Sequence, residues 1–229
     1  MSKQDRVRLI PLGGGGEIGK NMLVIESEQD IIVIDSGLAF PEEDMLGIDI
    51  VIPDITYLLE NQSKVRAIFL SHGHEDHIGA LPYVLQQLNV PVYGTKLTLG
   101  LVKGKLKEFD MEDEATLCEV NEGDKVQIGT FEVEFIRVNH SIADVVAFAV
   151  HTPAGIIVIA TDFKFDHTPI CGKVANFHKF AELGDQGVAL LVSDSTNAER
   201  PGYTLSEKVV GETFDEVFRL AKGRIIVAS

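Results

Sequence analysis

The sequence predicts an α/β fold in which two β-sheets lie between layers of helices. Short runs rich in β-branched residues, typical of strands, fill the first third of the chain and return in its middle, and stretches with helical spacing are interleaved with them. Hydrophobic residues make up 45% and charged residues 24% of the 229 residues, which excludes a disordered or fibrous chain. We therefore expect a packed core.

The first half of the chain predicts four strands and two helices. Apolar and β-branched runs place the strands at residues 7–10, 21–25, 31–34 and 67–70. The last of these runs is continuously apolar, which suits a strand buried on both faces. Apolar residues at i, i+3, i+4 and i+7 from Leu81 predict a helix that begins near Gly79, and a second amphipathic helix is expected at about 96–109.

The second half predicts a return to strands, which are expected at residues 115–120, 125–128, 131–138, 146–151, 156–160 and 188–193. Thr152-Pro-Ala-Gly155 is typical of a hairpin turn. Helices are expected at about 174–183 and 205–222, and the apolar run at 225–227 predicts a final strand. Because a natural domain seldom ends directly after such a strand, we expect an N-terminal piece of a longer protein.

The chain carries 20 basic and 35 acidic residues, a formal net charge of −15. This balance argues against binding nucleic acid or anionic lipid, because affinity for phosphates comes largely from Lys and Arg, although a bound cation can reverse the local sign. The sequence has neither an apolar run of membrane-spanning length nor signal-peptide features. Cys118 and Cys171 lie outside any Cys-x-x-Cys pair, which fits a reducing compartment. We expect a cytoplasmic protein without a membrane partner.

A glycine-rich loop at residues 13–19 contains the G-x-G-x-x-G form of a dinucleotide-binding fingerprint and nearly matches a P-loop. The P-loop needs Ser or Thr after its lysine, whereas Lys20 is followed by Asn21. Both motifs also need a helix after the loop, so that its first amides meet the phosphates, and residues 21–25 predict a strand instead. We therefore expect a tight turn between two strands and no nucleotide cofactor.

The segment Ser71-His-Gly-His-Glu-Asp-His77 carries the strongest chemical signal. Its three histidines and one aspartate follow a predicted buried strand, a rigid base from which side chains can converge. Imidazole and carboxylate together suit zinc, manganese or iron rather than calcium. Four ligands on so short a loop point in different directions, so we expect two ions and further ligands from elsewhere in the chain. His140 and Asp162, each directly after an apolar strand, are the candidates.

These residues, together with Asp35 in Val-Ile-Asp-Ser-Gly, resemble the ordered motifs of the metallo-β-lactamase superfamily. The resemblance implies the αβ/βα sandwich of that superfamily, with two mixed sheets flanked by helices, incomplete here at its C-terminal end. It also implies two divalent ions, with Zn²⁺ the first choice and Mn²⁺ the second. The implied ligands are His72, His74 and His140 for one ion, Asp76 and His77 for the other, and Asp162 as a bridge between them. Asp35 would orient the His-rich loop from behind these ligands.

The last ligand of the superfamily, a histidine on a later strand, has no candidate in this sequence. The histidines left outside the motifs are expected to be structural or surface residues: His151, His167 and His178.

Several stretches resemble the bacterial β-CASP ribonucleases within this superfamily: residues 16–21, 40–54, 71–83, 161–166 and 193–202. The resemblance implies a 5′-to-3′ exoribonuclease with endonuclease capability that acts on RNA in messenger RNA decay and ribosomal RNA maturation. Asp194 matches the first β-CASP motif and is expected to be catalytic together with Asp76; a turn or helix-capping role is the alternative for Asp194. Residues 1–203 would belong to the metallo-β-lactamase domain and 204–229 would begin the β-CASP domain.

The remaining β-CASP motifs and the homo-oligomer interface of such nucleases would lie beyond this chain, so we expect little or no nuclease activity from it alone. A metallo-β-lactamase-fold hydrolase of small molecules, such as a thioesterase or lactonase, is the alternative function. A non-catalytic binding module is the third possibility.

Overall fold

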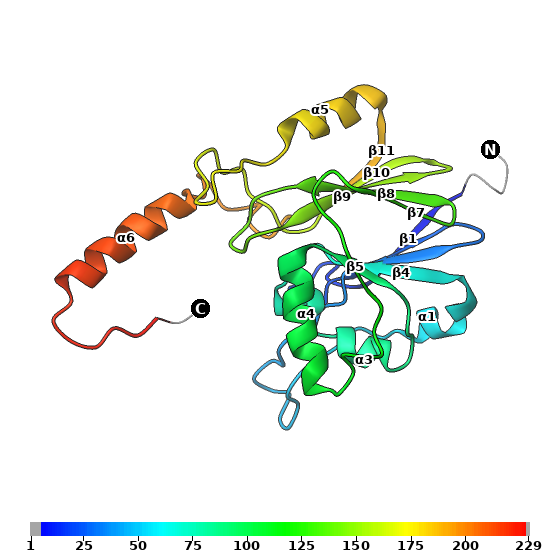
Figure 1. Cartoon of the computed structure of the whole chain (residues 1–229), viewed down its shortest axis with the longest axis horizontal. Helices are drawn as coiled ribbons and strands as arrows, with labels where there is room; N and C mark the ends of the chain where they lie inside the picture. The colour runs from blue at the N-terminus through cyan, green and yellow to red at the C-terminus, as the bar shows by residue number, and fades with distance from the viewer. Residues whose placement is uncertain (1–5, 228–229) are drawn as a thin grey trace.

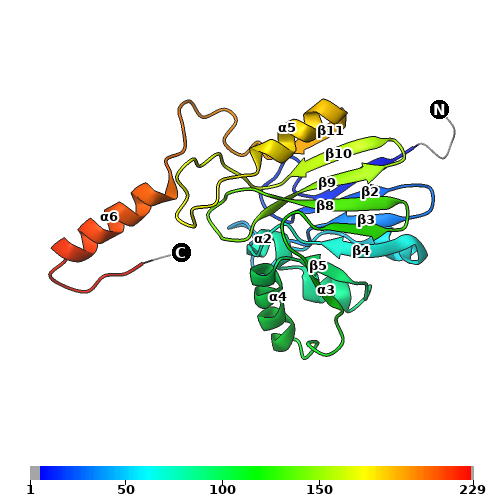
Figure 2. The same cartoon turned by 45° about the horizontal axis from the view of Figure 1, so that its top comes forward.

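Two mixed β-sheets pack face to face, with helices on their outer faces, in the computed structural model, which describes residues 6–227 (Figure 1 and Figure 2). The fold class predicted from the sequence is confirmed. Each sheet contains both parallel and antiparallel neighbours.

The first sheet has the strand order β1-β2-β3-β4-β5-β6, in which β1 to β3 pair antiparallel and β3 to β6 pair parallel. Its strands are β1 (Arg8–Gly13), β2 (Met22–Glu26), β3 (Ile31–Ile34), β4 (Val65–Phe69), β5 (Val92–Gly94) and β6 (Leu117–Glu119). The helices between them are α1 (Thr56–Glu60), a 3-10 turn (Gln62–Lys64), α2 (Glu75–Ile78), α3 (Leu81–Leu85) and α4 (Lys96–Glu108).

The second sheet has the order β11-β10-β9-β8-β7, and only its β10 and β11 pair parallel. Its strands are β7 (Lys125–Ile128), β8 (Phe131–Arg137), β9 (Val146–Thr152), β10 (Gly155–Ala160) and β11 (Val188–Ser193). The predicted hairpin turn joins β9 to β10. Helix α5 (Phe177–Gln186) covers the outer face of this sheet, and α6 (Glu207–Leu220) extends away from both sheets (Figure 1).

Successive side chains of the central strands point to opposite faces of the sheet, which divides the core into layers. In β3, Ile31 and Val33 join the cluster beneath the helices of the first sheet, whereas Ile32 and Ile34 pack between the two sheets. A third cluster lies between β8 to β10 and α5, where Leu183 is buried. Each fully buried aliphatic side chain of this kind contributes about 1.5 to 3 kcal/mol to folding, so the carboxyl ends of the central strands are firmly placed.

Helix boundaries differ from the prediction in a way that affects the site. The helix expected to begin near Gly79 is two short helices, and the first, α2, already begins at Glu75. Asp76 and His77 therefore lie on a helical turn rather than in a loop. Helix α5 begins three residues later than expected, because Asn176 accepts a hydrogen bond from the Lys179 amide and caps it there.

The strand predicted at 225–227 is wrong. These residues run outside any sheet after α6, and Ile226 is 85% exposed. An extended apolar run becomes a strand only where a neighbouring strand offers backbone partners, and no strand within residues 6–227 does so here. Helix α6 likewise has no buried residue. Of the helices within the described part of the chain, none combines the length and the apolarity needed to cross a membrane.

Candidate metal centre

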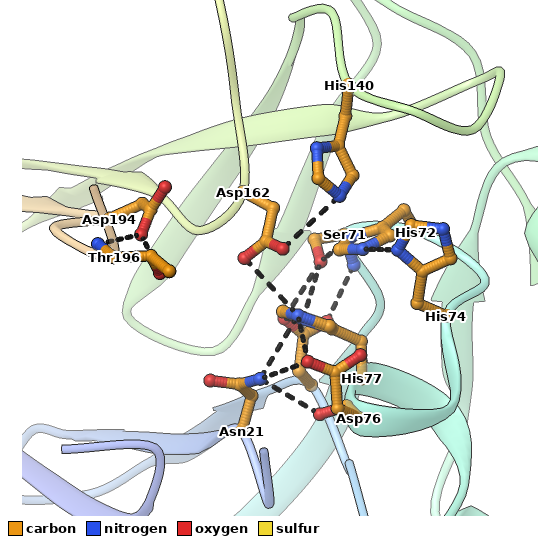
Figure 3. Close-up of polar contacts among 11 residues, drawn as sticks. Asn21, Ser71, His72, His74, Asp76, His77, His140, Asp162, Asp194 and Thr196 are labelled. Carbon is orange, nitrogen blue, oxygen red and sulfur yellow. Dashed lines mark hydrogen bonds and ion pairs between the residues drawn. The ribbon is translucent and has the colours of Figure 1, made fainter. Parts of the chain in front are cut away.

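The candidate site forms where strands of both sheets end (Figure 3). The residues lie in the segments that follow the carboxyl ends of their strands: Asp35 after β3, Ser71 to His77 after β4 and into α2, His140 after β8, Asp162 after β10 and Asp194 after β11. The strands are buried and fixed, so side chains far apart in sequence meet at one edge of the sandwich.

Three histidines and one aspartate form a group that could hold a metal ion. Single ligand atoms of these residues all lie within 4.8 Å of one another: His72, His74, His140 and Asp162. Nε2 of His72 lies 3.0 Å from Nδ1 of His74, and Nε2 of His140 lies 3.3 Å from Oδ2 of Asp162. His72 is fully buried, while the other three are half-buried.

Electrostatics keep two of these imidazoles neutral. Burial, followed by the charge of His77, lowers the pKa of His72 to about 2. Burial and the neighbouring His140 also lower the pKa of His74. Neutral imidazoles retain a free nitrogen lone pair near neutral pH, which is the form that binds a metal ion.

Asp162 also faces a second pair of candidate ligands, Asp76 and His77. Its Oδ1 lies 3.4 Å from Nε2 of His77, and the same nitrogen lies 3.6 Å from Oδ2 of Asp76. The two oxygens of one carboxylate thus face His140 on one side and His77 on the other (Figure 3). Burial alone would raise the pKa of Asp162, but its contacts with these two histidines hold the pKa well below the usual range.

Asp35 supports this arrangement from the interior. Its side chain is 1% exposed, and Oδ1 accepts a hydrogen bond of 2.7 Å from the amide of Ser71. Oδ2 accepts from the Ser71 hydroxyl at 2.8 Å and from Nδ1 of His77 at 2.7 Å. Asp35 is therefore bonded both to the start of the His-rich loop and to one of its imidazoles.

The donor set fits divalent cations. Burial would lower the pKa of His77, but the Asp35 carboxylate and hydrogen bonds to Asp162 and Asp35 raise it to about 10, so a positive charge is favoured where Asp76, His77 and Asp162 meet. With Nδ1–H directed at Asp35, Nε2 is the atom left to bind a cation. Nitrogen and carboxylate ligands of this kind suit zinc or manganese rather than calcium.

Asp194 lies on the rim of the same region. Its Oδ1 accepts hydrogen bonds from the amide of Thr196 at 2.7 Å and from the hydroxyl of Thr196 at 2.6 Å, which closes a local turn. A cavity of about 490 Å³ is bordered by Asp194, by the carboxylates Asp76 and Asp162, and by the glycine-rich loop. That loop is followed by strand β2, as the sequence predicted, and not by a helix.

The remaining histidines lie away from the cluster. His151 faces Glu134 at 3.6 Å on the outer side of the second sheet, His167 stacks on Phe177, and His178 is an exposed residue of α5.

Two contacting residues were not foreseen from the sequence. Ser71 donates to Asp35, and Asn21 lies against Asp76 and His77. The position of Ser71 directly before the first histidine could have indicated its role. Asn21 is 55 residues from Asp76, and only the fold brings them together.

The fold and this cluster define an α/β sandwich that carries, at its strand ends, side chains that could hold a metal ion. A family model described as the Metallo-beta-lactamase superfamily matches residues 15–199, and the chain belongs to this superfamily.

Among curated proteins, the chain is 48% identical to Ribonuclease J of Thermus thermophilus over 99% of its length and 47% identical to Ribonuclease J2 of Bacillus subtilis over 98%. The alignments span 41% and 40% of those two proteins, so the chain covers about two-fifths of their length. A solved metallo-β-lactamase variant from Cronobacter sakazakii superposes with a TM-score of 0.55 at 16% identity, covering 96% of this chain and 86% of that one, a likeness of fold alone.

Proposed function

We propose that this chain is the N-terminal, metal-binding part of a cytoplasmic ribonuclease that hydrolyses RNA phosphodiesters with divalent cations. The observation that carries the proposal is the Asp162 carboxylate, whose two oxygens face two separate groups of ligand atoms. The identity of 44–48% to proteins named Ribonuclease J supports RNA as the substrate. The activity would be 5′-to-3′ exonucleolytic with endonuclease capability, serving messenger RNA decay and ribosomal RNA maturation.

The proposed ligands divide as the distances suggest. One ion would be held by His72, His74 and His140, the other by Asp76 and His77, with Asp162 shared between them. Bound there, divalent cations such as Zn²⁺ or Mn²⁺ supply an acidified water and withdraw charge from phosphate oxygens. They also offset part of the net charge of −15 where an RNA phosphate must approach.

The residues of the chain would bind, orient and move protons. Asp35 accepts the hydrogen bond from Nδ1–H of His77, which leaves Nε2 of His77 available to bind a metal ion. Asp194 would take part in protonating the leaving oxygen. Within residues 6–227 its carboxylate bonds only to Thr196, so its histidine partner would come from a later part of the protein. In this proposal residues 1–203 belong to the metallo-β-lactamase domain and 204–229 begin a β-CASP domain, beyond which the homo-oligomer would form.

The test is RNA hydrolysis by the longer product of the gene and by this chain, with a 5′-monophosphorylated oligoribonucleotide and either Zn²⁺ or Mn²⁺. We expect metal-dependent cleavage by the longer product, its loss with a chelator, and little or no cleavage by this chain alone. His140→Ala should lower the rate of the longer product on the order of 100-fold or more, because it removes a ligand. His151→Ala is the matched control and should leave the rate unchanged.

Two results would contradict the proposal. Hydrolysis of a thioester or lactone without hydrolysis of RNA would indicate a small-molecule enzyme. Rapid metal-dependent RNA cleavage by residues 1–229 alone, abolished by Asp76→Ala, would show that later segments are not needed.

A further inference from the structure

Asn21 contacts the same ligand pair that the proposed second ion would use. Its side-chain Nδ2 donates to the main-chain oxygen of Asp76 at 3.0 Å and to Oδ2 of Asp76 at 3.3 Å, and it lies 3.1 Å from Nε2 of His77. The backbone amide of Asn21 donates to the same Asp76 oxygen at 3.1 Å. Asn21, which directly precedes β2, therefore holds the first turn of α2 by both its backbone and its side chain (Figure 3).

The orientation of Asp76 depends on this contact. The side chain of Asp76 is 36% exposed, and Asn21 is the hydrogen-bond donor that the structure places on its carboxylate. His77, in contrast, is fully buried and already bonded to Asp35. Without Asn21, a half-exposed aspartate would turn freely between rotamers, and ordering it for an ion would cost side-chain entropy.

The glycine-rich loop leaves space for the Asn21 amide. A Cβ on Gly14 would lie 2.4 Å from Oδ1 of Asn21. Gly37 allows a similarly close approach on the other side, because its Cβ would lie 1.5 Å from the Asp76 carbonyl oxygen, and its amide donates to the Asn21 carbonyl at 2.9 Å. The loop that resembles a nucleotide fingerprint therefore has a packing role at the metal centre.

We propose that Asn21, given room by Gly14, is a positioning residue that orients Asp76 and His77 for the second divalent cation. The inference rests on the two-ion centre proposed above. With Nδ1–H of His77 directed at Asp35, the Asn21 amide lies 3.1 Å from Nε2 of His77 and donates to Asp76, so both ligands are held in place before an ion binds. When an ion takes the Nε2 lone pair, the bonds of Asn21 to Asp76 remain.

The experiment is a zinc titration of the 229-residue chain, with calorimetry for the number of ions and nitrogen NMR of the histidine side chains to assign each binding event. The variants are Asn21→Ala and Gly14→Ala. Gly16→Ala is the matched control, because Gly14 and Gly16 both have a left-handed backbone, with φ of +78° and +80°, but a Cβ on Gly16 would meet nothing within 4 Å. Asn61→Ala removes a comparable amide-to-carbonyl bond far from the site.

We expect two zinc ions on the unmodified chain. Asn21→Ala and Gly14→Ala should weaken the event that shifts the His77 signal by about 10- to 100-fold, while the event reported by His72, His74 and His140 changes by less than about twofold. Gly16→Ala and Asn61→Ala should leave both events unchanged. If Asn21→Ala does not fold, as judged by circular dichroism, the comparison of Gly14→Ala with Gly16→Ala decides.

Equal weakening by Gly14→Ala and Gly16→Ala, or undiminished binding at His77 in Asn21→Ala, would overturn the role of Asn21 while leaving the metal centre intact. Failure of the unmodified chain to bind a second ion would overturn both the inference and the two-ion centre.

Discussion

The connections after β4 and β11 both border the cavity at the metal centre, but they are held in different ways. After β4, Ser71, His72 and His77 are fully buried, and Asp35 bonds to this segment from the interior. After β11, the amide of Asp194 donates to the Ala160 carbonyl, but within residues 6–227 its carboxylate bonds only to Thr196, two residues further along. The side chains of the first connection are held by distant parts of the chain, whereas the side chain of Asp194 is held by its own turn.

The positions of the two strands explain this difference. β4 lies inside its sheet between β3 and β5, and both of its faces are covered. β11 is an edge strand, and Leu190 and Leu191 on it are 43% and 61% exposed. The proposed ligands of the His-rich segment therefore follow a central strand, whereas the residue proposed to work with a later segment follows the edge strand.

The largest effect should come from removing the interior support. Asp35→Ala is expected to lower the free energy of unfolding of the metal-free chain by about 3 to 5 kcal/mol, because it leaves the Ser71 donors and the buried His77 without their partner. Urea denaturation followed by circular dichroism measures this. Asp54→Ala removes an exposed aspartate that bonds a nearby amide, and should cost under about 1 kcal/mol. An equal loss in the two variants would show that Asp35 has no special structural role.

An intermediate effect is expected for the carboxylate between the two ligand groups. Asp162→Ala should weaken zinc binding on the order of 100-fold, because one substitution removes a ligand from both groups. Calorimetry on the chain measures the affinity, with His151→Ala as a control that should bind zinc normally. Loss of only one ion in Asp162→Ala would argue that the carboxylate serves a single metal.

The smallest effect should come from the connection after β11. Asp194→Ala is expected to lower the free energy of unfolding by about 1 kcal/mol or less, since it removes only the hydrogen bonds that Thr196 donates in an exposed turn. Its zinc affinity should match that of the unmodified chain. A marked loss of zinc binding would mean that Asp194 is a ligand, and the contrast between the two connections would no longer hold.

Sequence patterns predicted the parts of the molecule that depend on local order. The apolar runs that form β3, β4, β9 and β10 were predicted from their residues alone. The resemblance of the motifs to the metallo-β-lactamase superfamily predicted that His72, His140 and Asp162 share one site, and their ligand atoms do lie together. The strand at 225–227 failed because pairing depends on a partner and not on the run itself. The contact of Asn21 with Asp76 was not predictable, because it depends on how the fold brings the residue before β2 against the start of α2.

The exposed apolar surface of β11 also bears on how the chain would behave in solution. An edge strand with apolar side chains offers unpaired backbone groups to any other extended segment, a common route to aggregation. Helix α6 adds Phe214 and Phe218, which stack on each other at its exposed surface. Solubility of the isolated chain would then depend on its large negative charge, and would fall as salt screens the repulsion between molecules.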